Sequence, residues 1–89
     1  MKTVVIDGRR CKTRGQTHAY LAGKPIIPPY YGKNLDALYD VLSALGEPVH
    51  VRVRYPASIE ANLGKYGETL LRVFREAAAA NKNLTVEFL

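Results

Sequence analysis

The chain has 89 residues, of which 47% are hydrophobic and 24% are charged. These values are typical of one folded domain, so we expect residues 1–89 to form a single unit. A chain of this length buries only about two thirds of its unfolded surface, which argues against a large enclosed active site. Its 13 Lys and Arg exceed its 8 Asp and Glu, and the net charge of +5 favours nucleic acid, an anionic surface or an acidic protein as partner.

The cysteine count and the amino terminus favour the cytoplasm. Cys11 is the one cysteine, so no internal disulfide can form, and two histidines without a second cysteine cannot complete a structural zinc site. Its neighbours Arg10 and Lys12 would somewhat favour the thiolate form of Cys11, but without a resolving cysteine or a catalytic base we expect an incidental thiol. The apolar run before Asp7 has only three residues, Val4 to Ile6, fewer than a signal peptide needs. We expect a cytoplasmic protein with no metal, no cofactor and no membrane partner.

The first third of the chain predicts one strand and one short helix. Residues 2–6 are short and rich in β-branched side chains, and the Asp7-Gly8 turn ends them, as is typical of a strand. A basic stretch follows, and residues 16–22 then favour a helix that ends at Gly23. Three prolines between residues 24 and 33 predict an extended connection, because each fixes its own φ and disfavours helix before it.

The middle of the chain predicts an amphipathic helix over 35–45, with Asn34 as its N-cap. At about 100° per residue, one side of this helix is apolar and must face the core. That side carries Leu35, Leu38, Val41, Leu42 and Leu45. The opposite, exposed side carries Asp36, Tyr39, Asp40 and Ser43.

The last part of the chain alternates strands with helices. Residues 49–55 and 84–88 alternate apolar and polar side chains, which predicts strands with one wet face. Between them, 57–63 and 65–80 favour helices separated by Gly64. The longer helix directs Tyr66, Leu70, Val73, Phe74 and Ala77 inward. Strands separated by helices predict an α/β fold with a three-stranded parallel sheet, whose helices pack mainly on one face.

Two carboxylates on the helix over 35–45 are the sharpest chemical feature. Asp36 lies in the first turn, where the helix dipole stabilises an anion. Asp40 has no such support and lies four residues after Asp36, a repulsive spacing, while positions 43 and 44 hold no cation. On spacing alone, the pair is either a solvated face or a binding surface. Outward carboxylates with flanking tyrosines would suit the Arg and Lys with which a nucleic-acid enzyme holds phosphates.

The segment at 30–40, YYGKNLDALYD, resembles the signature of the barstar family, and VFREA at 73–77 is similar to a second stretch of that family. Together with chain length and element order, the resemblance covers nearly the whole sequence. It implies a bacterial, cytoplasmic, antitoxin-like immunity protein that is not an enzyme. Such a protein inhibits a secreted, guanyl-type ribonuclease of the barnase kind by covering its active site in a 1:1 complex.

The resemblance also implies a set of partner-binding residues. Asp40 would enter the phosphate site of the ribonuclease as the central anchor, Asp36 would meet further donors, and Tyr30 would pack on the catalytic histidine side. Further matching interface positions are Gly32, Asn34, Leu35, Ala37, Tyr39 and Ser43. Glu76 would make a second acidic contact, or would instead pair with Arg72 in its own helix. The Glu47–Pro48 bond matches a cis proline position of the family.

Three departures from the family qualify this interpretation. Tyr39 stands where barstar has tryptophan, and Lys33 replaces a glutamate, either as a solvated charge or as a contact that discriminates among ribonucleases. The chain is also basic, whereas barstar is acidic. A basic inhibitor would be repelled by a basic enzyme, so we expect a partner that is acidic overall yet keeps a basic active site. The free inhibitor is expected to be a monomer.

The alternative is a small basic RNA-binding module. Its candidate phosphate contacts are Arg9, Arg10, Lys12, Arg14, Arg52 and Arg54, with Tyr20 and Tyr55 nearby. Clustered cations beside aromatic rings are sufficient for weak, salt-dependent binding. However, the sequence has no RNP or GXXG motif, and the tyrosines do not repeat along one strand face. Ribonuclease inhibition is therefore the main interpretation, and it includes no nucleic acid.

Overall fold

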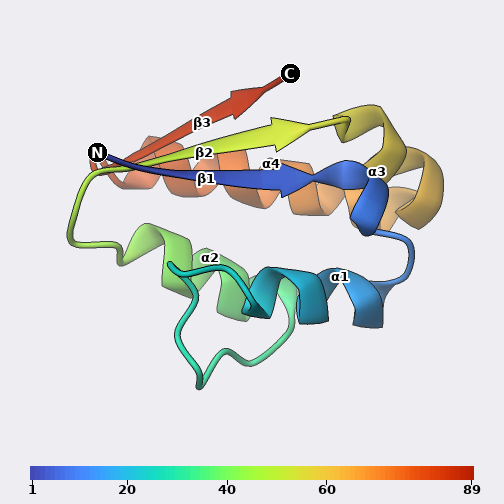
Figure 1. The fold of residues 1–89 in the computed structure, drawn as a ribbon, viewed down its shortest axis with the longest axis horizontal. Coiled ribbons are helices and arrows are strands. Elements are labelled where there is room, and N and C mark those ends of the chain that lie inside the picture. The colour runs from blue at the N-terminus through green and yellow to red at the C-terminus, as the bar shows by residue number, and fades with distance from the viewer.

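A computed structural model describes all residues from Met1 to Leu89. Its sheet consists of β1 (Lys2–Asp7), β2 (Val49–Arg54) and β3 (Leu84–Phe88), in the order β1-β2-β3 with both pairings parallel (Figure 1). Lys2 pairs with Val49, and Val49 pairs with Leu84, so the three strands start at one edge of the molecule. The predicted α/β fold with a three-stranded parallel sheet is confirmed.

The helices follow the predicted order with small differences at their ends. They are η1 (Gly8–Arg10), a single 3-10 turn, then α1 (Arg14–Ala22), α2 (Leu35–Ser43), α3 (Pro56–Leu63) and α4 (Lys65–Ala80). α1 begins two residues earlier than predicted because the Thr13 hydroxyl caps it, accepting a hydrogen bond from the Gln16 amide at 3.1 Å. α2 ends at Ser43 instead of Leu45, and η1 was not predicted.

The core lies on one face of the sheet. Val51 and Val53 of β2 are fully buried, in one cluster with Leu38 of α2 and Phe74 of α4. Figure 1 shows α4 running behind the strands, with α1 and α2 beyond the β1 edge, and α2 packs against α4. The opposite face of the sheet carries the polar positions of the strands, which are exposed or half-buried: Thr3, His50, Arg52, Thr85 and Glu87. Helices therefore cover mainly one face, as expected.

The expectation of a cis proline bond is wrong. No peptide bond is cis, so the cis bond that the resemblance implied at Glu47–Pro48 is absent. None of the helices combines the length and the apolar character that crossing a membrane would require.

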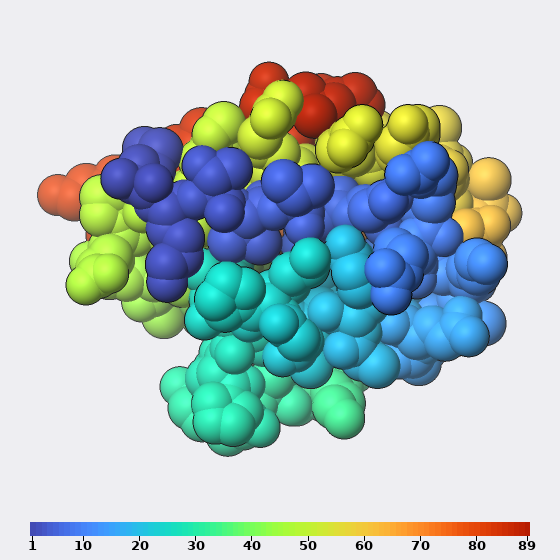
Figure 2. All heavy atoms as spheres, viewed as in Figure 1, coloured from blue at the N-terminus to red at the C-terminus, as the bar shows by residue number.

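The connection between α1 and α2, residues 23–34, stands out from the rest of the molecule. In Figure 2 it forms a protrusion at the lower edge, below the surface made by α1. Its path is fixed by successive turns, in which the Ile27 amide donates to the Lys24 carbonyl at 3.1 Å and the Tyr31 amide to the Pro28 carbonyl at 3.1 Å. This connection delivers the chain to the amino end of α2, where the candidate site begins.

Candidate functional site

The start of α2 is built by a polar turn. The Asn34 side chain accepts a hydrogen bond from the Ala37 amide at 2.7 Å and donates one to the Gly32 carbonyl at 3.3 Å. Lys33 adopts a left-handed conformation with φ of 58°, which turns the chain into the helix. A Cβ at Gly32 would lie 3.2 Å from the Ala37 Cβ, tighter than ordinary packing. These local constraints confirm Asn34 as the N-cap and fix the direction in which α2 presents its side chains.

The two carboxylates of α2 are exposed and have no ionic partner within the chain. Asp36 and Asp40 lie one helical turn apart and both point to solvent. Every ion pair in the molecule uses another acid, because Asp7 pairs with Arg9 at 2.9 Å and Glu87 contacts Arg52 at 3.1 Å and His50 at 3.2 Å. α2 therefore presents two uncompensated negative charges on one face of a protein that is positive overall.

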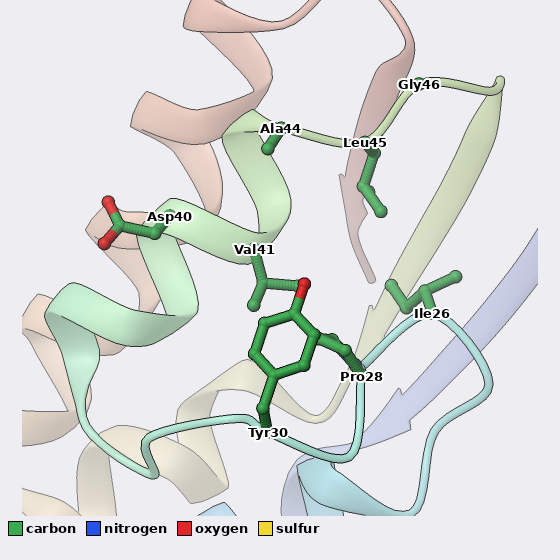
Figure 3. Close-up of a pocket in the computed structure, with 8 residues that line it drawn as sticks. All are labelled: Ile26, Pro28, Tyr30, Asp40, Val41, Ala44, Leu45 and Gly46. Carbon is green, nitrogen blue, oxygen red and sulfur yellow. The ribbon is translucent and has the colours of Figure 1, made fainter.

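A groove runs beside Asp40. It has a volume of about 390 Å³ and is lined by Ile26, Pro28, Tyr30, Asp40, Val41, Ala44, Leu45 and Gly46 (Figure 3). Figure 3 shows the Tyr30 ring standing beside Val41 and Pro28, while the Asp40 carboxylate points away from the other lining side chains. Tyr30 is 84% exposed. The groove thus offers an apolar floor and one aromatic ring next to an anion, a combination that fits a cationic or ring-bearing side chain of a partner.

The residue after Tyr30 has the opposite environment. Tyr31 is buried, and its hydroxyl lies 2.6 Å from Nδ1 of His18 on α1. The other ring nitrogen of His18, Nε2, lies 2.6 Å from the Tyr66 hydroxyl on α4. We call these three residues the buried cluster. It ties the segment that leads into α2 to two other helices, and so holds Tyr30 in its exposed position.

Burial determines the protonation of this cluster. Desolvation lowers the pKa of His18 and raises the pKa of Tyr31 to about 12. His18 is therefore neutral near pH 7, with one ring nitrogen donating and the other accepting. Sequence reasoning assigned His18 no role, because its partners lie 13 and 48 residues away and leave no local pattern.

The other predicted interface residues divide into two groups. Gly32 and Asn34 are exposed like the two carboxylates, whereas four positions are only half-exposed: Leu35, Ala37, Tyr39 and Ser43. Tyr39 was expected on the exposed side, but part of its ring packs against the core. The structure brings all these residues together at α2 and the turn before it, whereas Glu76 lies on α4, the helix against which α2 packs.

Glu76 is exposed and takes no part in any ion pair. The alternative, in which Glu76 pairs with Arg72 in its own helix, is therefore absent. Its carboxylate remains free for a partner, as do those of Asp36 and Asp40.

The environment of Cys11 does not support the thiolate that its basic neighbours suggested. Its side chain is fully buried, and burial raises the pKa of the thiol, so the basic neighbours do not favour the thiolate. No group of three or more His, Cys, Asp or Glu side chains lies close enough to hold a metal ion.

The fold and the charged face of α2 together define a small α/β protein that offers unpaired carboxylates on its surface. Residues 1–89 match the family model described as Barstar (barnase inhibitor). Over 78 residues, covering 86% of both chains, the sequence is also 35% identical to a Bacillus subtilis (strain 168) protein named "Putative ribonuclease inhibitor YrdF". The chain belongs to the barstar family.

Proposed function

We propose that the chain inhibits a secreted microbial ribonuclease of the guanyl type, by blocking its active site in a 1:1 complex. Family membership and the name of the Bacillus relative support inhibition of a ribonuclease. The observation that carries the mechanism is the pair of exposed carboxylates on α2, which have no partner within the chain. In this proposal the protein is an inhibitor and not an enzyme, and the blockade makes or breaks no covalent bond in it.

The proposed mechanism is phosphate mimicry. An enzyme that cuts RNA holds the phosphates with cationic side chains, and these side chains accept carboxylates in the same charge-assisted geometry. Asp40 takes the position of the central phosphate, and Asp36, one turn earlier, meets neighbouring donors. Tyr30 supplies a rigid aromatic surface for the catalytic histidine side of the enzyme, because its ring is free of the core.

The remaining contacts surround this centre. Gly32, which has no side chain, and the short side chain of Asn34 allow close approach of the partner to the turn before α2. The exposed parts of the half-buried α2 positions exclude water around the central ion pairs: Leu35, Ala37, Tyr39 and Ser43. Glu76 supplies the second, separate acidic contact.

The charge of the chain sets an expectation for the enzyme. Because the inhibitor carries +5, we propose an enzyme that is negative overall and positive at its active site, so that long-range attraction and local pairing act together. Association should then slow as salt concentration rises, which stopped-flow measurements at several salt concentrations can follow. Association that becomes faster with salt would contradict an acidic partner. We also propose that the free inhibitor is a cytoplasmic monomer.

The direct test is an activity titration. A guanyl-type ribonuclease is titrated with the parent chain, with Asp40→Ala and with a matched control, Glu60→Ala. Glu60 is also an exposed, unpaired carboxylate, but it lies on α3. We expect a stoichiometric endpoint for the parent and the control, and a far weaker inhibitor for Asp40→Ala. Equal potency of Asp40→Ala and the parent would contradict the anchor assignment.

A further inference from the structure

A second charged surface lies away from the acidic face of α2. Arg10 and Lys24 both stack on the Tyr20 ring, with Arg10 Cζ 5.2 Å and Lys24 Nζ 4.5 Å from its centroid. Arg9 and Arg54 both stack on the Tyr55 ring, at 4.1 Å and 5.5 Å. With Lys12, these residues form what we call the basic strip: Lys24, Tyr20, Arg10, Lys12, Arg9, Tyr55 and Arg54.

The strip is continuous, although its members come from three separate segments. A groove of about 520 Å³ joins its centre and is lined by Arg9, Arg10, Lys12, Gln16, Ala19 and Tyr20. Gly8 allows η1 to approach the end of β2, because a Cβ there would overlap the Tyr55 carbonyl oxygen. This close approach brings Arg9, after β1, and Arg54, at the end of β2, onto one tyrosine ring.

Little negative charge compensates the strip. Asp7 is the acid within it, and its carboxylate is engaged by Arg9 through two side-chain hydrogen bonds at 3.1 Å and 2.9 Å. The same contact holds the pKa of Asp7 down to about 2, so this carboxylate stays ionised and occupied at any physiological pH. Arg10, Lys12 and Arg54 form no ion pair and are exposed.

We propose that the basic strip binds the phosphodiester backbone of a single-stranded polynucleotide, as an activity additional to the inhibition proposed above. Positive charge in a row, interleaved with aromatic rings, is the arrangement with which proteins follow such a strand without reading its sequence. Tyr20 and Tyr55 each already carry two cations on or beside their rings. The contacts are therefore mainly to phosphates, made by guanidinium and ammonium groups that the tyrosines hold in place.

The shape of the strip distinguishes this ligand from a compact anion. A single phosphate would need its donors to converge on one point, whereas these cations are distributed along a line of two rings and a groove. An extended chain with one charge per unit uses them all. An acidic protein segment has the same sign of charge, and the experiment below separates it from a polynucleotide.

The strip and the acidic face of α2 share no residue. Figure 2 shows the segment after β1, with η1 and the start of α1, at one side of the molecule, and the protruding α1–α2 connection at the lower edge. Binding at the strip can therefore be altered without altering the carboxylates of α2. This separation makes the two proposals independently testable.

The experiment measures fluorescence anisotropy of labelled single-stranded 12-residue oligonucleotides, one of RNA and one of DNA, with the full chain. The strip variant is Arg10→Gln/Lys12→Gln/Arg54→Gln. The matched control, Lys2→Gln/Arg72→Gln/Lys82→Gln, removes the same charge from exposed residues outside the strip. Ribonuclease titration of all three chains reports on the inhibitory face in parallel.

For the parent we expect a dissociation constant in the range of about 10⁻⁴ to 10⁻⁶ M at physiological salt. The strip variant should bind at least about tenfold more weakly, with the salt slope reduced by about 2, because about 0.7 counterions are released per phosphate neutralised. The dissociation constant of the control should stay within about twofold of the parent value, because its substitutions change only the surface outside the strip. Tighter binding of RNA than of DNA would identify RNA as the ligand, and equal binding would assign the strip to the shared backbone.

Three results would overturn the proposal. The first is a parent chain that does not bind either oligonucleotide at low salt. The second is an equal loss of binding in the two triple variants, and the third is tighter binding of poly-glutamate than of the oligonucleotides. Amide chemical shifts of the unmodified chain give a check that needs no variant. Addition of oligonucleotide should shift residues 8–24 and 54–55, and shifts confined to other residues would contradict the assignment.

Discussion

Two consecutive tyrosines show how the protein divides recognition from stability. Tyr30 is 84% exposed and stands beside the acidic face of α2, whereas Tyr31 is 6% exposed and hydrogen-bonds to His18. The Tyr30 ring leaves its apolar surface exposed, and its hydroxyl has no hydrogen-bond partner in the chain. The Tyr31 ring is packed in the core, and its hydroxyl is hydrogen-bonded. Changes on the exposed side should therefore alter inhibition and leave folding intact, whereas changes in the buried cluster should act mainly by lowering folding stability.

The largest effect is expected for Asp40→Ala. If Asp40 is the anchor, its removal leaves enzyme cations buried and unpaired, which costs about 2–5 kcal/mol of binding free energy. The free energy of unfolding should rise by about a few tenths of a kcal/mol, because the repulsion from Asp36, four residues earlier, is relieved. Inhibition titrations and denaturant unfolding measure the two quantities. A variant that loses several kcal/mol of folding stability would place Asp40 on the structural side of the comparison.

His18→Leu tests the buried cluster. It leaves the buried Tyr31 hydroxyl without a partner, which should lower the free energy of unfolding by about 1–3 kcal/mol. Adding Tyr31→Phe removes that orphaned group, so the second substitution should cost less in this background than in the parent. A double-mutant cycle by urea unfolding measures the difference. Strict additivity of the two substitutions would show that the His18–Tyr31 contact contributes nothing.

Tyr30→Ala is the exposed counterpart. Loss of the ring should weaken inhibition by about 1–2 kcal/mol, since a rigid aromatic contact is removed from the partner surface. Folding stability should change by no more than about 0.5 kcal/mol, as for other exposed positions. Isothermal titration calorimetry and thermal unfolding give the two numbers. Unchanged affinity would remove Tyr30 from the interface.

The smallest effect concerns pH. Because the pKa of His18 is lowered in the folded state, the unfolded chain binds more protons below about pH 6.5. Folding stability should therefore be full above that pH and should decline as pH falls through it, until His18 is protonated in the folded state as well. His18→Gln should flatten this part of the profile. A parent profile that is flat between pH 7 and pH 5 would contradict the lowered pKa.

The sequence predicted most of the fold because its signals are local. Each signal lies within or beside the element that it defines: the alternation in 49–55, the Asn34 cap, and the glycines at 23 and 64. The predicted β2, α2 and α4 are therefore present in the structure. The end of α2 was placed too late because Leu45 continues the apolar periodicity, although the helix has already ended. There the carbonyls of Leu42 and Leu45 accept hydrogen bonds from the distant Asn81 side chain instead.

The candidate site was predictable only in part, for the same reason. Asp36, Asp40 and Tyr30 follow from helical spacing and from a family motif. The buried cluster joins positions 18, 31 and 66, and the basic strip joins three segments through shared tyrosine rings. The sequence indicated every member of the strip except Lys24. Which cations share which tyrosine ring depends, like the buried cluster, on tertiary contacts that no sequence pattern specifies.

The most direct measurement is the structure of the chain bound to a ribonuclease that it inhibits. We expect the Asp40 carboxylate to accept hydrogen bonds from the cationic side chains that line the catalytic site, with Asp36 and Tyr30 also covered by the enzyme. A complex in which this side of α2 faces solvent, and the enzyme contacts the open sheet face or the basic strip instead, would contradict it.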